Sequence, residues 1–205
     1  MALHRPITLP PAAIPPVPAS LPQWAARFDR VHVDLGTGDG HYALRVARTH
    51  PTQAVIGLDT MLDHLRGARK RDPRNLRYIQ ADALAWTPGT LPVADVVTIN
   101  FPYGSLLKGL VEADPALVER LVALLGSGSH LAIRVNRSAL VATGLDPVAG
   151  PDRIAATVRQ LPGVRVATHA LARDDLRAFP SSWAKRLGYG RETDAVLIEA
   201  VRRGG

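Results

Sequence analysis

The chain contains no cysteine, which excludes disulfide bonds, thiol catalysis and zinc sites built from cysteines. Its seven histidines show no H-E-x-x-H spacing, so His32, His41 and His50 are interpreted as structural or solvated and no metal site is expected. No apolar run approaches the ~20 residues that cross a bilayer. The first 22 residues hold seven prolines and do not resemble a secretory signal. We therefore expect an intracellular, cytoplasmic protein without a membrane partner.

Length and charge indicate a globular protein with a polyanionic partner. The 205 residues suit one domain with a sizeable core. We expect a proline-rich arm at 1–22 that packs on a single domain at 23–205, and a monomer. The chain has 25 lysines and arginines against 18 acidic residues, a net charge of +7. Such an excess usually indicates a nucleic-acid partner.

Apolar runs and helical patterns alternate along the chain. Strands are predicted at 31–35, 54–58, 76–80, 94–100, 129–135, 164–171 and 194–201. Helices are predicted at 41–49, 61–71, 115–125 and 152–161, with a shorter one at 181–188. This alternation predicts a doubly wound α/β fold with a seven-stranded, mostly parallel sheet covered on both faces. The last two strands, joined by a link at 172–182, should form an antiparallel hairpin.

The first predicted strand runs into a glycine-rich loop and a helix, over the sequence VHVDLGTGDG at 31–40. Its three glycines let the main chain approach a ligand closely. The spacing is not the G-x-G-x-x-G of dinucleotide enzymes, and Asp34 and Asp39 would repel a pyrophosphate. A cationic ligand fits better, and S-adenosylmethionine carries a sulfonium and an ammonium but no phosphate. The alternative is a tight turn that binds no ligand.

Two further strand ends carry carboxylates. The second predicted strand ends at Asp59, about twenty residues after the loop, where a doubly wound fold places an acid on ribose hydroxyls. The third ends near Asp82, which could accept a hydrogen bond from the adenine of the cofactor. The alternative is that both residues cap the helices that follow. The candidate cofactor-binding residues are Asp34, Gly36, Thr37, Gly38, Asp39, Gly40, Asp59, Asp82, Ala83 and Asn100.

Two aromatic residues are candidates for contact with a substrate base. Tyr103 follows the fourth predicted strand, beyond whose carboxyl end ligands lie in such folds. It could stack on a flipped base or pack beneath its own loop. Trp183 stands close to Lys185 and Arg186, which favours a nucleic-acid surface over a core. The alternative for Trp183 is a residue that anchors an amphipathic helix.

Basic residues gather in two clusters. The first consists of Arg66, Arg69, Lys70, Arg71, Arg74 and Arg77, and the second of Lys185, Arg186 and Arg191. Because only Asp63 and Asp72 lie near the first cluster in the sequence, it is predicted to contact phosphates. The cations of the second cluster, which follow Trp183, are predicted to contact phosphates beside a stacked base. The alternative is a solvated helix face. The candidate RNA-binding residues are Arg66, Arg69, Lys70, Arg71, Lys185, Arg186 and Arg191.

Four stretches carry a resemblance to a known family: FDRVHVDLGTGDG at 28–40, IGLD at 56–59, FPYGSLL at 101–107 and WAKRLGYGR at 183–191. With them the chain resembles the aminoglycoside-resistance 16S rRNA methyltransferases that act on N1 of adenine 1408. The resemblance implies a class I S-adenosylmethionine-dependent methyltransferase fold, which is Rossmann-like, and 16S rRNA in the 30S subunit as partner. It implies that Tyr103 and Trp183 are the catalytic residues that sandwich the adenine, and that Ser105 lines the cofactor pocket. It also implies that Arg186 and Arg191 contact the rRNA.

The chain departs from the family pattern at Tyr103, where the family usually has tryptophan, and at Asp82, where a small residue is common. Two alternatives therefore stay open beside adenine methylation. One is a methyltransferase for another RNA or a small molecule, and the other is a cofactor-binding homologue with weak or no activity. Adenine N1 has an in-plane lone pair, so its methylation needs alignment and no general base.

Overall fold

The computed structural model describes residues 16–65, 72–189 and 194–204, without the side chains of His64, Ser182, Trp183, Arg186 and Leu187. All seven predicted strands are present, with bounds that differ from the prediction by four residues at most. They are β1 (Arg30–Leu35), β2 (Gln53–Asp59), β3 (Leu76–Gln80), β4 (Ala94–Asn100), β5 (Leu125–Asn136), β6 (Val164–Leu171) and β7 (Ala195–Arg202).

Eight α-helices and one short 3₁₀ helix, η1, lie in the described ranges. The α-helices are α1 (Leu21–Ala25), α2 (His41–Thr49), α3 (Gly104–Glu112), α4 (Pro115–Leu124), α5 (Arg137–Ala142), α6 (Gly150–Arg159), α7 (Arg173–Ala178) and α8 (Ser182–Tyr189), and η1 is Asp63–Leu65. The predictions for α2, α4, α6 and α8 are confirmed. None of the described part of the chain forms a helix long and apolar enough to cross a membrane.

The sheet has the order β3-β2-β1-β4-β5-β7-β6. The five strands from β3 to β5 run parallel, and β7 is antiparallel to both β5 and β6. The predicted doubly wound sheet and its terminal hairpin are therefore confirmed. The order reverses between β1 and β4, and in such folds ligands bind beyond the carboxyl ends of the strands at this switch point.

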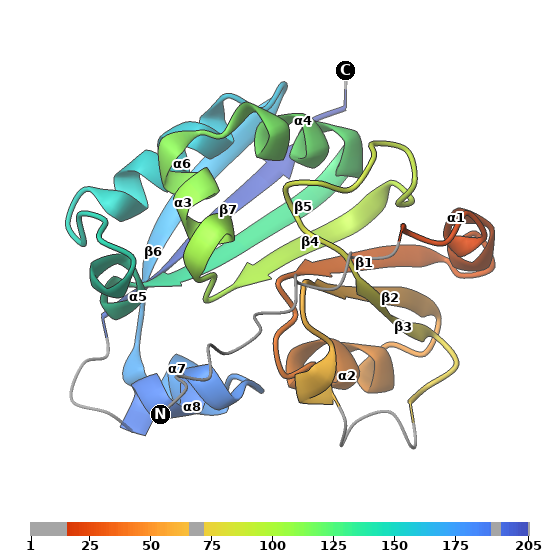
Figure 1. The fold of residues 1–205 in the computed structure, drawn as a ribbon, viewed down its shortest axis with the longest axis horizontal. Helices are drawn as coiled ribbons and strands as arrows, with labels where there is room; N and C mark the ends of the chain where they lie inside the picture. Colours follow the sequence, from red (N-terminus) through yellow and green to blue (C-terminus); the bar gives the residue numbers. More distant parts are fainter. Residues whose placement is uncertain (1–15, 66–71, 190–193, 205) are drawn as a thin grey trace, which may run out of the picture.

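Helices cover the sheet on both faces (Figure 1). Alternate strand residues such as Leu35 and Leu58 belong to the main core with leucines of α3 and α4. Val55 points to the opposite face, where it packs with Ala43 and Ala47 of α2. Further along that face, α7 and α8 form a small cluster with β7 and Phe101. The alternating direction of side chains along each strand explains why both faces are apolar.

The helix predicted at 61–71 does not begin at Met61. The backbone N–H of Met61 donates to Asp59 Oδ1 at 3.0 Å, so the chain turns locally before η1 begins at Asp63. Residues 66–71 lie outside the described ranges. Four short or amphipathic helices were not predicted, namely α1, α3, α5 and α7. The signal for α3 is its buried stripe of Leu106, Leu107, Leu110 and Val111.

The described part of the predicted arm, residues 16–22, packs against the domain. Leu21 is buried in α1, and Val17 packs against the main core. The division of the chain at residue 22 stays a prediction.

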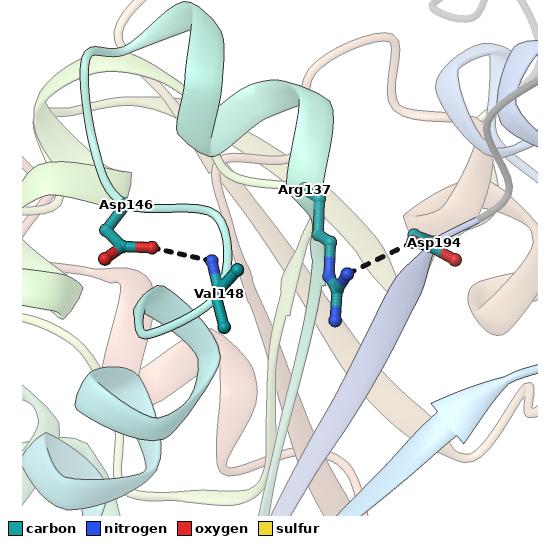
Figure 2. Close-up of polar contacts among 4 residues, drawn as sticks. All are labelled: Arg137, Asp146, Val148 and Asp194. Carbon is teal, nitrogen blue, oxygen red and sulfur yellow. Dashed lines mark hydrogen bonds and ion pairs between the residues drawn. The ribbon is translucent and has the colours of Figure 1, made fainter.

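The segment that carries α7 and α8 returns to the sheet at Asp194. Figure 2 shows Arg137 directed at this residue, with Arg137 Nη1 3.3 Å from Asp194 Oδ2. The same view shows a separate turn, in which Asp146 accepts a hydrogen bond from the backbone N–H of Val148 at 2.8 Å. Arg137 also donates its backbone N–H to the carbonyl of Asp194 at 3.1 Å. Because Arg137 directly follows β5, these contacts fix the start of β7 beside the end of β5.

Candidate methyl-donor site

A cavity of about 720 Å³ opens beyond the carboxyl ends of β1, β2 and β4. Its volume is within the range of small-molecule sites. Ten of the eleven candidate cofactor-binding residues line it: Asp34, Gly36, Thr37, Gly38, Asp39, Asp59, Asp82, Ala83, Asn100 and Ser105. The described lining includes four aspartates and neither lysine nor arginine. This composition suits a cationic ligand and disfavours a phosphate.

Gly40 is the one candidate that does not line the cavity. It has a φ of +73° and forms the N-cap of α2, and its carbonyl accepts a hydrogen bond from the Tyr78 hydroxyl at 2.8 Å. A Cβ at this position would overlap Leu65 and approach the Tyr78 oxygen at 2.7 Å. Gly40 therefore has a structural role in starting α2, and its direct contact with a cofactor stays a prediction.

Asp34 forms the floor of the cavity and is almost fully buried. Its Oδ1 accepts hydrogen bonds from Thr98 Oγ1 at 2.7 Å and from Asn100 Nδ2 at 2.9 Å. Burial raises the pKa of Asp34 to about 6, although these donors and the nearby Arg134 favour the charged form. The cavity floor therefore changes its charge near pH 6.

Asp59 and Asp82 cap backbone groups and also line the cavity. Asp59 Oδ2 accepts from the backbone N–H of Gly38 at 2.8 Å, and its Oδ1 accepts from that of Met61. Asp59 therefore ties the glycine loop after β1 to the end of β2. Asp82 Oδ1 accepts from the backbone N–H of Leu84 at 2.9 Å. The two readings of these acids, as caps and as cavity residues, are thus compatible.

The loop after β4 turns sharply and exposes an aromatic ring at the cavity rim. Phe101 is buried with a φ of +54°, a strained angle for a non-glycine residue, and its N–H donates to the Arg134 carbonyl at 2.7 Å. Two residues later Tyr103 lines the cavity with 56% of its surface exposed. The alternative that Tyr103 packs beneath its loop is therefore wrong.

Aromatic stacking attaches the segment with α7 and α8 to the cavity. Tyr42 lines the cavity, and its ring stacks on Phe179 with centroids 5.0 Å apart. The Arg134 guanidinium lies 4.8 Å from the centre of the same Phe179 ring, and Arg134 Nη1 donates to Asn100 Oδ1 at 3.0 Å. Phe179 precedes Ser181, which also lines the cavity. The start of α8 is therefore held at the rim.

Sequence reasoning missed several cavity residues. His41, interpreted as structural or solvated, lines the cavity together with Tyr42, and both directly follow the glycine loop at the start of α2. Their position directly after the glycine loop is a sequence signal from which both could have been predicted to line the cavity. Ser181 reaches the cavity only through tertiary packing, so no local pattern marks it. His32, by contrast, is buried and bonded to Thr98 at 3.0 Å, which is a structural role.

Of the candidate RNA-binding residues, Lys185 is the one whose side chain is described. Lys185 is exposed on α8, and its side chain lines a groove next to the cavity. Trp183 and Arg186 also belong to α8, but their side chains are not among those described. Four residues of the first cluster and one of the second lie outside the described ranges, namely Arg66, Arg69, Lys70, Arg71 and Arg191.

The fold and its site have counterparts among solved structures. The 16S rRNA methyltransferase KamB superposes with a TM-score of 0.74 at 24% identity over 89% of this chain and 92% of its own, a likeness of fold. A tryptophan-to-alanine variant of the Catenulisporales acidiphilia 16S rRNA (adenine(1408)-N(1))-methyltransferase, with cosubstrate SAM, gives a TM-score of 0.67 at 29% identity over 89% of each chain. The strand order and the cavity at the switch point define a class I S-adenosylmethionine-dependent methyltransferase fold.

The particular family follows from comparison along the whole sequence. The family model described as NpmA, 16S rRNA (adenine(1408)-N(1))-methyltransferase, matches residues 13–202. The 16S rRNA (adenine(1408)-N(1))-methyltransferase of Streptoalloteichus hindustanus is 28% identical over 195 residues, which cover 87% of this chain and 90% of that protein. The chain belongs to the NpmA family of 16S rRNA (adenine(1408)-N(1))-methyltransferases.

Proposed function

We propose that this protein transfers a methyl group from S-adenosylmethionine to N1 of adenine 1408 in the 16S rRNA of the 30S subunit. The proposal includes action as a cytoplasmic monomer and resistance to aminoglycosides as the outcome. The main observation that supports this proposal is that one cavity combines a lining of four aspartates with the exposed ring of Tyr103 at its rim. The family match over residues 13–202 supports the substrate.

The acidic lining has the charge that a sulfonium and an ammonium require. In the proposal Asp34 attracts the cationic part of the cofactor from the cavity floor, and Asp59 holds the ribose while keeping Gly38 in place. Asp82 and Ala83 line the adenine end, and Asn100 and Ser105 lie on the side of the methyl group. When bound, S-adenosylmethionine supplies an electrophilic methyl group that needs no metal.

The target base would be held by stacking. Tyr103 offers one aromatic face, and Trp183 is proposed as the other because its helix starts directly after Ser181 at the rim. Each base-on-aromatic contact contributes about 1–3 kcal/mol. Because adenine N1 already carries a lone pair, these residues raise the rate by proximity and orientation and remove no proton.

Primer extension on 30S subunits incubated with the protein and S-adenosylmethionine tests the proposal. We expect a stop at adenine 1408, and its absence would refute this function. Trp183→Ala should abolish the stop while leaving cofactor affinity within about twofold of the original. Methyl transfer to bulk tRNA without transfer to 30S subunits would instead favour another RNA substrate.

A further inference from the structure

A groove continues from the cavity along the exposed side of α2. It has a volume of about 450 Å³, and two of its lining residues, His41 and Ser181, also line the cavity. Arg45, Arg48 and Lys185 line the same groove, which therefore lies between α2 and the start of α8. Arg45 Nη1 donates to the carbonyl of Ala178 at 3.3 Å, so α2 and α7 are in direct contact there.

A second groove of about 590 Å³ adjoins the first. The two share Arg48, and the second adds Arg27 and Arg74. All three arginines are exposed, and none of them forms an ion pair within the described ranges. The described lining of both grooves includes no aspartate or glutamate. The charge of the lining residues therefore changes from acidic in the cavity to basic in the grooves. The boundary lies at His41 and Ser181, which line both the cavity and the first groove.

The basic residues of α2 form a line along one face of the helix. His41, Arg45 and Arg48 are spaced i, i+4 and i+7, and all three are exposed. At 1.5 Å per residue, this line extends about 10 Å from the cavity toward the amino ends of the strands. Figure 1 shows α2 lying alongside β2 and β3, and Ala43 and Ala47 of this helix pack against the strands.

We propose that these two grooves, lined by Arg27, Arg45, Arg48, Arg74 and Lys185 and here called the α2 groove, bind the RNA backbone that flanks the target nucleotide. This inference rests on the proposed function and extends the predicted contacts to α2 and the loop before β1. A line of exposed basic residues that begins at the rim of the cavity suits successive phosphates of a strand. A membrane surface would instead require an apolar face beside the basic one, and on this side α2 turns its apolar residues toward the sheet.

The double variant Arg27→Gln/Arg48→Gln tests this proposal in the full-length protein. Neither side chain forms a hydrogen bond or ion pair within the described ranges, so the fold should be preserved. The matched control is Arg153→Gln/Arg159→Gln, which removes two exposed arginines from α6 on the opposite face of the sheet. Binding to 30S subunits is measured by fluorescence anisotropy between about 50 and 300 mM salt, alongside methyl transfer and S-adenosylmethionine affinity.

We expect the α2 groove variant to bind 30S subunits roughly tenfold more weakly at about 150 mM salt. The slope of log affinity against log salt should fall by about 1.4 to 1.8, as expected for two lost phosphate contacts. KM for 30S subunits should rise with kcat and cofactor affinity unchanged. The α6 control should match the original protein in all of these measurements.

The same experiment separates failure of this inference from failure of the proposed function. Equal salt slopes and KM values for the α2 groove variant and the original protein would overturn the inference, even if adenine 1408 is methylated. If the original protein binds 30S subunits but does not methylate adenine 1408, a reduced slope in the variant still supports the groove. Loss of binding to phosphatidylglycerol vesicles, with 30S binding intact, would assign the arginines to a membrane and overturn the inference.

Discussion

Asn100 Nδ2 donates a hydrogen bond to Asp34 Oδ1 over 2.9 Å and thereby joins the neighbouring strands β4 and β1 at the floor of the cavity. The other end of the amide is also fixed, because Asn100 Oδ1 accepts from Arg134 at 3.0 Å. The Asn100 amide therefore connects the buried acid to the arginine that lies against Phe179. Asn100 and Arg134 therefore influence both the charge of Asp34 and the attachment of the segment that carries α7 and α8.

The affinity for S-adenosylmethionine should depend on the charge of Asp34. Because burial raises the pKa of Asp34 to about 6, the carboxylate is mostly charged at pH 7 and mostly protonated at pH 5. A cationic ligand binds the charged form, so we expect the Kd for the cofactor to rise about tenfold between pH 7 and pH 5. Isothermal titration calorimetry at half-unit steps measures this change.

The Asp34→Asn variant is the control for that titration. It should bind the cofactor more weakly at pH 7 and show little pH dependence between 5 and 7. If the variant keeps the pH dependence of the original protein, the titrating group is a different one and the role proposed for Asp34 is wrong.

The stability of the fold should show two opposing pH effects that nearly cancel. Burial lowers the pKa of His32 to about 4, so its contribution to stability is lost as pH falls from about 6.5 toward 4. The raised pKa of Asp34 has the opposite sign, since stability is lost as pH rises from about 3.8 through 6. Removal of His32 should therefore expose the Asp34 effect.

We expect His32→Gln to become more stable relative to the original protein on acidification. The difference in free energy of unfolding should shift by about 2 kcal/mol in favour of the variant between pH 7.5 and pH 5. Urea denaturation at both pH values measures it, and the exposed His130→Gln is the control. A pH-independent difference would contradict the assignment of His32 as a buried neutral residue.

Asp59→Ala should weaken cofactor binding through the glycine loop. The variant removes the acceptor for the N–H groups of Gly38 and Met61, so the loop loses its connection to β2. We expect S-adenosylmethionine to bind at least tenfold more weakly. A matched control is Asp114→Ala, which removes the N-cap of α4 and should cost about 1 kcal/mol of stability without any change in cofactor affinity. Equal loss of cofactor affinity in both variants would indicate a general loss of stability.

Tyr103→Ala should reduce methyl transfer without changing cofactor affinity. Loss of the stacking ring removes about 1–3 kcal/mol, which corresponds to a roughly 5- to 150-fold lower kcat/KM on 30S subunits. Tyr103→Phe keeps the ring and should stay within a few-fold of the original rate, and Tyr103→Trp should raise it. Single-turnover assays measure the rates. If Tyr103→Ala weakens cofactor binding as strongly as it slows transfer, the ring has a cofactor role and is not a base platform.

The strand pattern could be predicted well because most of the strands are short runs rich in β-branched and other apolar residues, and five of the seven end in a polar or charged residue. The carboxylates at or just after the ends of β1, β2 and β3 could also be predicted, since strand ends are local sequence features. Short helices were harder to predict from the sequence. In α7, the sequence RDDLRA carries only Leu176 as a buried residue, so its helical form depends on packing with α8 and leaves little periodicity in the sequence.

The sequence by itself determined the seven strands, the helices α2, α4, α6 and α8, the glycine loop and the chemical character of the cavity, because these depend on local periodicity and on which residues end each strand. Only the tertiary structure decided that Gly40 supports α2 instead of lining the cavity, and that Asn100 connects Asp34 to Arg134. It also decided that Arg27, Arg45 and Arg48 form a continuous basic groove. The physical reason is that these relationships join residues from different elements, and their distances are set by sheet register and helix packing.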